Sequence, residues 1–171
     1  DANTIREYVT INRATNEGES TDIGDNNLLM AYCHLGHNCK LGKGIIMSNS
    51  IQVAGHVVIE DQAVIGGCLG IHQFVHVGRF AMVGGMTRVD RDVPPYSLVE
   101  GHPGRLRGLN KVGIRRNGMD FDDGSEFSQL KETWSLLFRS EHVLLKSLEL
   151  ARKNHLMPAS LHLCDFVYAS I

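Results

Sequence analysis

Two histidines stand three residues apart in the stretch HLGHNC, residues 34–39. An imidazole changes its charge near neutral pH, so it can transfer a proton, and its neutral form can ligate a metal ion. His34 and His37 lie in a tract that is otherwise aliphatic and small. The spacing alone leaves three interpretations open: metal ligation, packing, and proton transfer in catalysis.

The aliphatic residues around these histidines repeat at every sixth position. Twelve consecutive members of this series are aliphatic or Met: Ile23, Leu29, Leu35, Leu41, Met47, Val53, Ile59, Ile65, Ile71, Val77, Val83 and Val89. An amphipathic helix would repeat every three or four residues, and a hairpin sheet every two. A strict period of six predicts short strands in which three hexads close an 18-residue coil, the hexapeptide parallel β-helix.

The repeat also sets the expected domain boundaries. Ile5 and Ile11 extend the register backwards, and NEGEST, residues 16–21, is a six-residue insertion that we expect to form a loop. The β-helix is therefore predicted over residues 1–93. Because the chain opens at Asp1 inside a segment that already looks structured, further coils are expected upstream.

The repeat stops at Pro94 and Pro95, which cannot donate the hydrogen bonds of a strand ladder. Residues 94–124 are predicted to be a connecting segment, basic because residues 105–118 carry five cations and no acid. A helical period follows and predicts a cap of three helices over residues 125–171. Its apolar stripes are Phe127, Leu130, Trp134, Leu137 and Phe138, then Leu144, Leu148 and Ala151.

Composition indicates an ordinary globular protein. The 171 residues are 43% hydrophobic with a net charge of −2, which gives no reason to expect a nucleic-acid partner. The four cysteines form no CxxC pair, which favours a reducing cytoplasm. No apolar run approaches the ~18 residues that would cross a bilayer, so no membrane span is predicted.

The six-residue register brings the histidines together. Residues 18 apart occupy neighbouring coils about 4.8 Å apart, so His37 is expected beside Gly55, and His56 above Asn38. His72 then adjoins Gln73, the next residue in the same column. We therefore predict a column of imidazoles along one outer edge of the coil.

Two chemistries fit such a column. Zinc could use His72 and His76, but the register puts them on different faces, and no Cys or carboxylate completes a tetrahedral set. In acyl transfer, His37 would take a proton from a sugar hydroxyl while the N–H of Gly55 binds the developing oxyanion. The second chemistry is favoured.

Several motifs closely resemble the cytoplasmic UDP-N-acetylglucosamine O-acyltransferases: NLLMAYCHLGHNCKLG (27–42), VAGHVVIED (53–61), IHQFVHVG (71–78), MVGG (82–85), DVPPY (92–96) and GLNKVGIRRNG (108–118). The resemblance covers nearly the whole chain. It implies a left-handed β-helix that forms a homotrimer with active sites between subunits. It also implies the first step of lipid A biosynthesis, transfer of a 3-hydroxyacyl chain from acyl carrier protein to the sugar 3-hydroxyl, without metal or cofactor.

The resemblance also assigns roles to residues. His37 would be the general base and Gly55 the oxyanion donor. His34, His56, His72 and Gln73 would line the sugar-nucleotide site, and Gly85 would leave the groove open to a longer acyl chain. Asn110 and Arg116 match positions that contact the ligand or the acidic carrier protein.

Two positions depart from the family pattern. Asn38 stands where the family usually has an Asp that orients the base, so Asn38→Asp is expected to raise turnover or shift its pH profile. GHPG, residues 101–104, replaces the common GNHA form and leaves contacts there unassigned.

The alternatives are a related N-acyltransferase, a CoA-dependent acetyltransferase, and a hexapeptide scaffold without activity. GLNKVGIRR and the helical segment disfavour the two other enzymes. The pairing of His37 with Gly55 disfavours the scaffold, whereas Asn38 leaves room for it.

Overall fold

The computed structural model describes residues 1–122 and 124–171. The chain divides into two compact units, Asp1–Asn110 and Lys111–Ile171, called here the coil unit and the helical unit. Each is described by itself.

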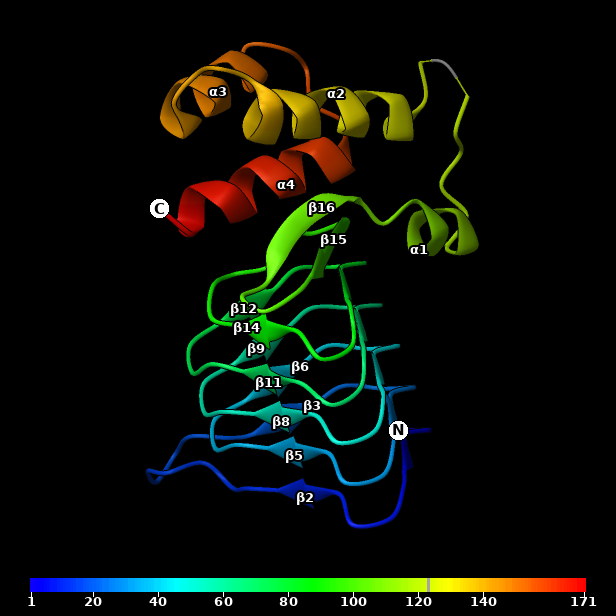
Figure 1. Cartoon of the computed structure of the whole chain (residues 1–171), viewed down its shortest axis with the longest axis vertical. Helices are drawn as coiled ribbons and strands as arrows, with labels where there is room; N and C mark the ends of the chain where they lie inside the picture. Colours follow the sequence, from blue (N-terminus) through cyan, green and yellow to red (C-terminus); the bar gives the residue numbers. More distant parts are fainter. Residues whose placement is uncertain (123) are drawn as a thin grey trace. The chain divides into compact units, whose positions relative to one another are not determined.

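The coil itself is built from strands of two residues that follow one another at six-residue intervals, except between β2 and β3 (Figure 1). They are β1 (Thr4–Ile5), β2 (Thr10–Ile11), β3 (Asp22–Ile23), β4 (Leu28–Leu29), β5 (His34–Leu35), β6 (Lys40–Leu41), β7 (Ile46–Met47), β8 (Gln52–Val53), β9 (Val58–Ile59), β10 (Val64–Ile65), β11 (Gly70–Ile71), β12 (His76–Val77), β13 (Met82–Val83) and β14 (Arg88–Val89). The predicted parallel β-helix is confirmed.

Three sheets run along the coil, each formed by every third strand. Their orders are β1-β4-β7-β10-β13, β2-β5-β8-β11-β14 and β3-β6-β9-β12, all with parallel pairing. Ile65 pairs with Met47 on one side and Val83 on the other, 18 residues away in each direction. Ile5 pairs instead with Leu29, 24 residues away, because residues 12–21 add six residues between β2 and β3.

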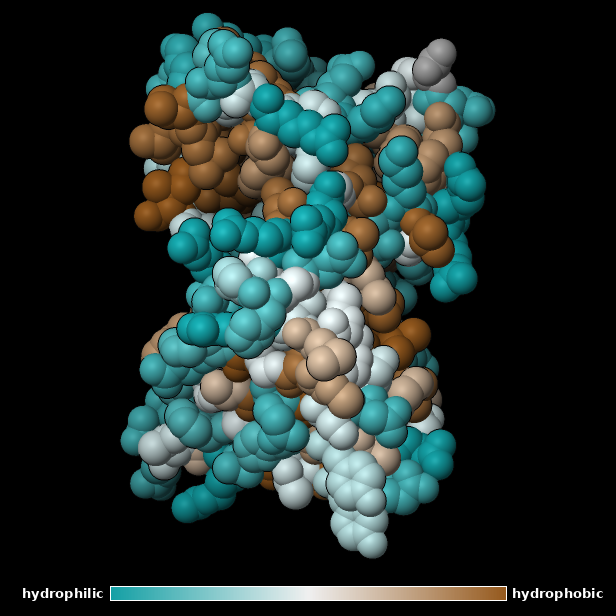
Figure 2. Space-filling model, in the orientation of Figure 1, coloured by the Kyte–Doolittle hydropathy of each residue, from teal (hydrophilic) through white to brown (hydrophobic). Residues whose placement is uncertain are grey.

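The aliphatic series fills the interior of the coil. Leu35, Met47, Val53 and Ile65 are fully buried, and neighbouring strands stack the same side chains from coil to coil. Removal of this apolar surface from water is the main driving force for the coil. The outer wall is mixed: Figure 2 shows hydrophilic and hydrophobic residues side by side on this part of the surface, and Tyr32, Ile46 and Phe74 are among the exposed apolar side chains.

The corners of the coil recur with the same period and require a left-handed backbone. Asn38, His56 and Phe74 have φ values of 61°, 60° and 66° and follow one another at 18-residue intervals. Asn tolerates this conformation better than most residues, whereas bulky side chains adopt it rarely. The fold thus places these three side chains on one edge of neighbouring coils.

The coil unit ends in two further strands, within the stretch that the sequence predicted to be a connecting segment. β15 (Ser97–Glu100) pairs in parallel with β13, and β16 (Arg105–Leu109) returns antiparallel to β15. The predicted segment 94–124 is therefore divided, with residues 94–110 in the coil unit and the rest in the helical unit. The ladder hydrogen bonds of β15 and β16 explain this division.

The helical unit contains α1 (Lys111–Arg116), α2 (Glu126–Arg139), α3 (Leu144–Ala151) and α4 (Pro158–Ala169). The predicted stripes face inward, because Leu130, Trp134 and Leu148 are buried. Pro158 occupies the first turn of α4, where its missing N–H costs no helical hydrogen bond. In the described part of the chain, no helix is long and apolar enough to span a membrane.

Candidate active site

His37 and Gly55 meet at a groove on the outer wall of the coil. A Cβ built on Gly55 would lie 2.6 Å from the Nε2 atom of His37, so only glycine leaves room for this imidazole position. The groove has a volume of about 280 Å³, and His34, Gln52 and Ala54 also line it. Nε2 is therefore the ring nitrogen on the glycine side.

The other ring nitrogen of His37 is held by polar neighbours. Its Nδ1 lies 2.8 Å from Asn38 Oδ1 and 3.0 Å from Thr15 Oγ1. The backbone N–H of Thr15 donates to the same Asn38 Oδ1 at 3.1 Å, which identifies this atom as the amide oxygen. An amide oxygen 2.8 Å from Nδ1 favours the tautomer of neutral His37 that carries its proton on Nδ1, which leaves the lone pair on Nε2.

The insertion contributes a carboxylate behind Asn38. Asn38 Nδ2 donates to Glu19 Oε2 at 2.7 Å, and the N–H of Asn38 donates to Thr21 Oγ1 at 2.9 Å. Asn16 holds Glu19 through its side-chain amide and its backbone N–H. Hydrogen bonds from Asn16 and then from Asn38 keep the pKa of Glu19 below its usual range. Sequence reasoning missed Thr15 and Glu19, because both lie outside the six-residue register.

His56 packs edge-on against His37, with ring centroids 5.0 Å apart, and stacks on Phe74 at 4.8 Å. The backbone N–H of His56 donates to the backbone carbonyl of His37 at 2.9 Å. His34 lines the same groove, and its Nδ1 lies 2.8 Å from Thr10 Oγ1. The structure thus brings three of the predicted histidines, His34, His37 and His56, to one edge of the coil.

His72 and Gln73 lie on the next coil, and both are exposed. His72 Nδ1 lies 3.1 Å from the carbonyl oxygen of Gln73. His72 lines a second hollow of about 340 Å³ together with Arg88 and Asp90. Ala54 and Ile71 line both hollows, so the two are adjacent along the wall.

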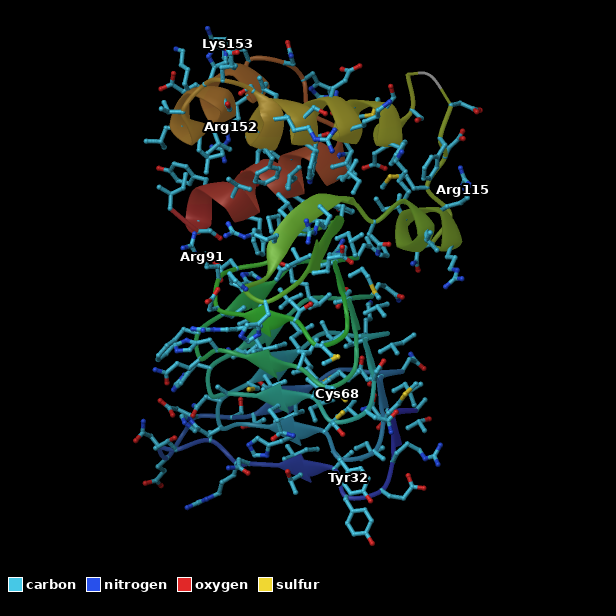
Figure 3. The ribbon with its side chains drawn as sticks, in the orientation of Figure 1. Tyr32, Cys68, Arg91, Arg115, Arg152 and Lys153 are labelled. Carbon is cyan, nitrogen blue, oxygen red and sulfur yellow. The ribbon has the colours of Figure 1, made fainter. Side chains whose placement is uncertain are left out.

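Gly85 follows β13 of the coil, and a Cβ there would lie 3.3 Å from the Gly67 carbonyl oxygen. Its neighbour Met86 lines a third hollow of about 420 Å³ with Cys68 and His102. Figure 3 labels Cys68 on the coil.

Asn110 and Arg116 fall in different units. Asn110 closes the coil unit, where its Nδ2 donates to the Phe80 carbonyl at 2.9 Å and its N–H donates to the Tyr96 carbonyl at 2.7 Å. Arg116 is an exposed residue at the end of α1. Each unit contains only one of these two residues, so the geometry within a unit does not place them next to each other.

The zinc interpretation gains no support from this geometry. Across residues 1–122 and 124–171, no group of three or more His, Cys, Asp or Glu side chains is arranged to hold a metal ion. His72 follows β11 and His76 lies in β12, strands of different sheets. His76 Nε2 lies instead 2.9 Å from Glu60 Oε1.

Known proteins share both the sequence and this architecture. A family model described as UDP N-acetylglucosamine O-acyltransferase, domain 2, matches residues 92–170. The acyl-[acyl-carrier-protein]–UDP-N-acetylglucosamine O-acyltransferase of Gloeothece citriformis is 51% identical over 170 residues, 99% of this chain and 60% of that protein. The enzyme of the same name from Synechocystis is also 51% identical, over 98% of this chain and 60% of that protein. The chain belongs to the UDP-N-acetylglucosamine O-acyltransferase family.

Solved structures of family members agree. The Arabidopsis UDP-N-acetylglucosamine acyltransferase has a TM-score of 0.91 at 39% identity, covering 99% of this chain and 60% of that one. The Campylobacter jejuni enzyme has the same TM-score and identity, and the match covers 99% of this chain and 66% of that one. The fold class, a left-handed parallel β-helix with a helical C-terminal part, is thereby confirmed. The chain spans about 60% of the length of the curated relatives named here.

Proposed function

We propose that this chain transfers a 3-hydroxyacyl group from acyl carrier protein to the 3-hydroxyl of UDP-N-acetylglucosamine, the first step of lipid A biosynthesis. The observation that carries the proposal is the position of His37. Its Nδ1 is engaged by Asn38, and its Nε2 is beside Gly55 at an open groove. Membership of the family supports the choice of substrates.

The proposed reaction uses this geometry directly. Nε2 of His37 removes the proton of the sugar 3-hydroxyl as its oxygen attacks the carbonyl carbon of the acyl thioester. The carbonyl π electrons move to the oxygen, which accepts a hydrogen bond from the N–H of Gly55. Among the described residues, no backbone carbonyl accepts a hydrogen bond from this N–H. The tetrahedral intermediate then expels the carrier thiolate, which takes the proton from Nε2.

Substrate contacts follow from the position of each side chain. His34, His56, His72 and Gln73 are proposed to bind the sugar nucleotide along the two adjacent hollows. Gly85 is proposed to leave the path of the acyl chain open. Asn110 and Arg116 are proposed to contact ligand or carrier, whose phosphates and acidic residues a guanidinium recognises.

We further propose a homotrimer with its active sites between subunits. The groove at His37 is open to solvent on the wall of a single coil, whereas ligand sites normally bury most of the ligand surface. A second subunit would supply the facing wall. A cytoplasmic location is supported by four free cysteines, at positions 33, 39, 68 and 164.

The test compares the full chain with its His37→Ala variant, using UDP-N-acetylglucosamine and 3-hydroxyacyl carrier proteins of several chain lengths, with and without chelator. We expect transfer that resists the chelator and falls at least about 100-fold in His37→Ala, since a general base contributes roughly 10²–10⁴-fold. His142→Ala, which removes an exposed histidine of the helical unit, is the control.

The panel of donors also tests the proposed role of Gly85. If its missing side chain leaves the acyl path open, the chain should prefer donors with longer acyl groups. Equal transfer by wild type and His37→Ala would reject the assigned base. No transfer by folded wild type would favour the scaffold, and transfer to an amino sugar or from acetyl-CoA instead would favour the alternative enzymes.

A further inference from the structure

We propose that Glu19 is a positioning residue for His37 and that it acts through the side-chain amide of Asn38. The insertion at residues 16–21 would thus supply the carboxylate that is missing next to the base. This inference rests on the function proposed above, because it assigns Glu19 a part in keeping His37 ready to accept a proton.

A continuous set of contacts joins the three residues, called here the positioning chain. His37 Nδ1 lies 2.8 Å from Asn38 Oδ1, and Asn38 Nδ2 lies 2.7 Å from Glu19 Oε2. Glu19 is itself fixed, because Asn16 Nδ2 donates to Oε1 at 3.1 Å and the N–H of Asn16 donates to Oε2 at 3.2 Å. The carboxylate therefore has a defined place although it is exposed.

The carboxylate determines which way the Asn38 amide faces. An amide can present either its oxygen or its NH₂ group, but an ionised carboxylate only accepts hydrogen bonds. Glu19 therefore selects the NH₂ group of Asn38 and leaves Oδ1 facing His37. The Thr15 N–H, 3.1 Å from Oδ1, favours the same orientation.

The orientation of the amide in turn fixes the tautomer of His37. If the NH₂ group faced Nδ1, that nitrogen would have to accept, and the ring proton would be on Nε2. A base with its proton on Nε2 cannot take a second proton there from the sugar hydroxyl. In addition, the negative charge of Glu19 polarises Asn38 and stabilises the imidazolium that forms when Nε2 is protonated.

The charge of Glu19 is present under working conditions. Hydrogen bonds from Asn16 and Asn38 lower its pKa, and the nearby His56 contributes in the same direction. At neutral pH the positioning chain therefore contains one carboxylate, one amide and one imidazole.

This arrangement changes what is expected of Asn38→Asp. An Asp at position 38 would place a second carboxylate at the 2.7 Å contact with Glu19, and two negative charges there repel each other. With Glu19 present, Asn38→Asp alone should therefore lower turnover rather than raise it. The same substitution should be favourable when residue 19 is an amide.

The decisive experiment is the charge swap between the two positions. We expect Glu19→Gln to lower kcat by about tenfold with little change in KM, the size of losing one charge-assisted hydrogen bond. We expect Asn38→Asp to lower kcat similarly. The double variant Glu19→Gln/Asn38→Asp should recover activity to within about twofold of wild type, because the NH₂ group introduced at position 19 can then donate to the carboxylate introduced at position 38.

Glu17→Gln is the matched control, since Glu17 is an exposed glutamate of the same insertion, and it should leave kcat unchanged. Additive losses in the double variant would overturn the inference and leave Glu19 as a residue that only fastens the loop. Unchanged kcat in Glu19→Gln would also overturn it.

A second readout does not depend on activity. Nitrogen-15 NMR of the His37 ring should show the Nδ1–H tautomer in wild type and in the charge-swapped chain, and a mixture of tautomers in Glu19→Ala. If wild type transfers no acyl group but its tautomer still responds to Glu19, the proposed function fails while the positioning chain stands. If wild type is active and neither kcat nor tautomer responds, the positioning chain alone is rejected.

Discussion

The absence of a side chain at Gly55 allows the imidazole of His37 to occupy its position in the groove. The nearest atoms to a Cβ at this position are Nε2, Cε1 and Cδ2 of His37, at 2.6, 2.7 and 3.1 Å. These atoms belong to a side chain that can rotate, so an added methyl group would displace the ring rather than the backbone. The same methyl group would shield the N–H of Gly55.

Gly55→Ala is therefore predicted to fold normally and to lose at least about 100-fold in kcat, because both the base and the oxyanion donor are disturbed. The measurement is kcat together with the midpoint of thermal unfolding. Gly108→Ala is the matched control, since a Cβ there meets nothing within 4 Å. Activity of Gly55→Ala near that of Gly108→Ala would contradict the prediction.

The pairing of His37 with Gly55 could be predicted from sequence, whereas the contacts behind the base could not. A strict register of 18 residues places residue 55 beside residue 37 without any structural information. Thr15 and Glu19 belong to a stretch where the repeat is interrupted, so no periodicity says where their side chains point. Only the folded loop shows that they reach Asn38.

Among the elements, α4 begins without a capping side chain of its own. Its N-cap residue, Met157, makes no side-chain cap hydrogen bond. Two residues of α2 supply the missing acceptors: Glu126 Oε1 accepts from the N–H of Ala159 at 2.8 Å, and Gln129 Oε1 accepts from the N–H of Met157 at 2.6 Å. A carboxylate at a helix N-terminus is also favoured by the helix dipole.

Glu126→Ala is accordingly predicted to lower the free energy of unfolding of the helical unit by about 0.5–2 kcal/mol, the usual cost of losing an N-terminal cap. Urea unfolding followed by fluorescence measures this effect selectively, because Trp134 is the one tryptophan of the chain and is buried in α2. Glu132→Ala, at an exposed position of the same helix, is expected to change stability by less than about 0.5 kcal/mol. Equal effects of the two substitutions would show that the contact with Ala159 contributes nothing.

The elements with a regular hydrophobic period were the ones that sequence could place. The twelve-residue aliphatic series became the inward positions of β3 to β14, and the stripes became α2 and α3. β15 and β16 were missed, because a strand of four or five residues that turns back antiparallel has no six-residue repeat. The short helix α1 was missed for a similar reason, since its cations mask any apolar stripe.

At the scale of the molecule, each unit has its own core and its own buried thiols. Cys33 and Cys39 are fully buried in the coil unit, where their thiols donate to the carbonyls of Ser48 and Ala54. Cys164 is fully buried in the helical unit. Cys68 is exposed, and Figure 3 labels it on the coil.

Burial also makes these thiols poor nucleophiles. Loss of hydration raises the pKa of Cys33 and Cys39 and raises the pKa of Cys164 to about 11. Since the thiolate is the reacting species, a raised pKa leaves less of it at pH 8 and slows alkylation. Packing excludes the reagent as well.

We predict that iodoacetamide at pH 8 modifies Cys33, Cys39 and Cys164 at least about 100-fold more slowly in the native chain than in the urea-unfolded chain. Cys68 should react faster than these three in the native state. Mass spectrometry of proteolytic peptides resolves the four sites. When the labelling is repeated at increasing urea concentrations, Cys33 and Cys39 should lose protection from alkylation together, because they share one core. Cys164 reports unfolding of the helical unit independently. Modification of Cys33 at its unfolded rate in the absence of urea would mean that the coil core is open in solution.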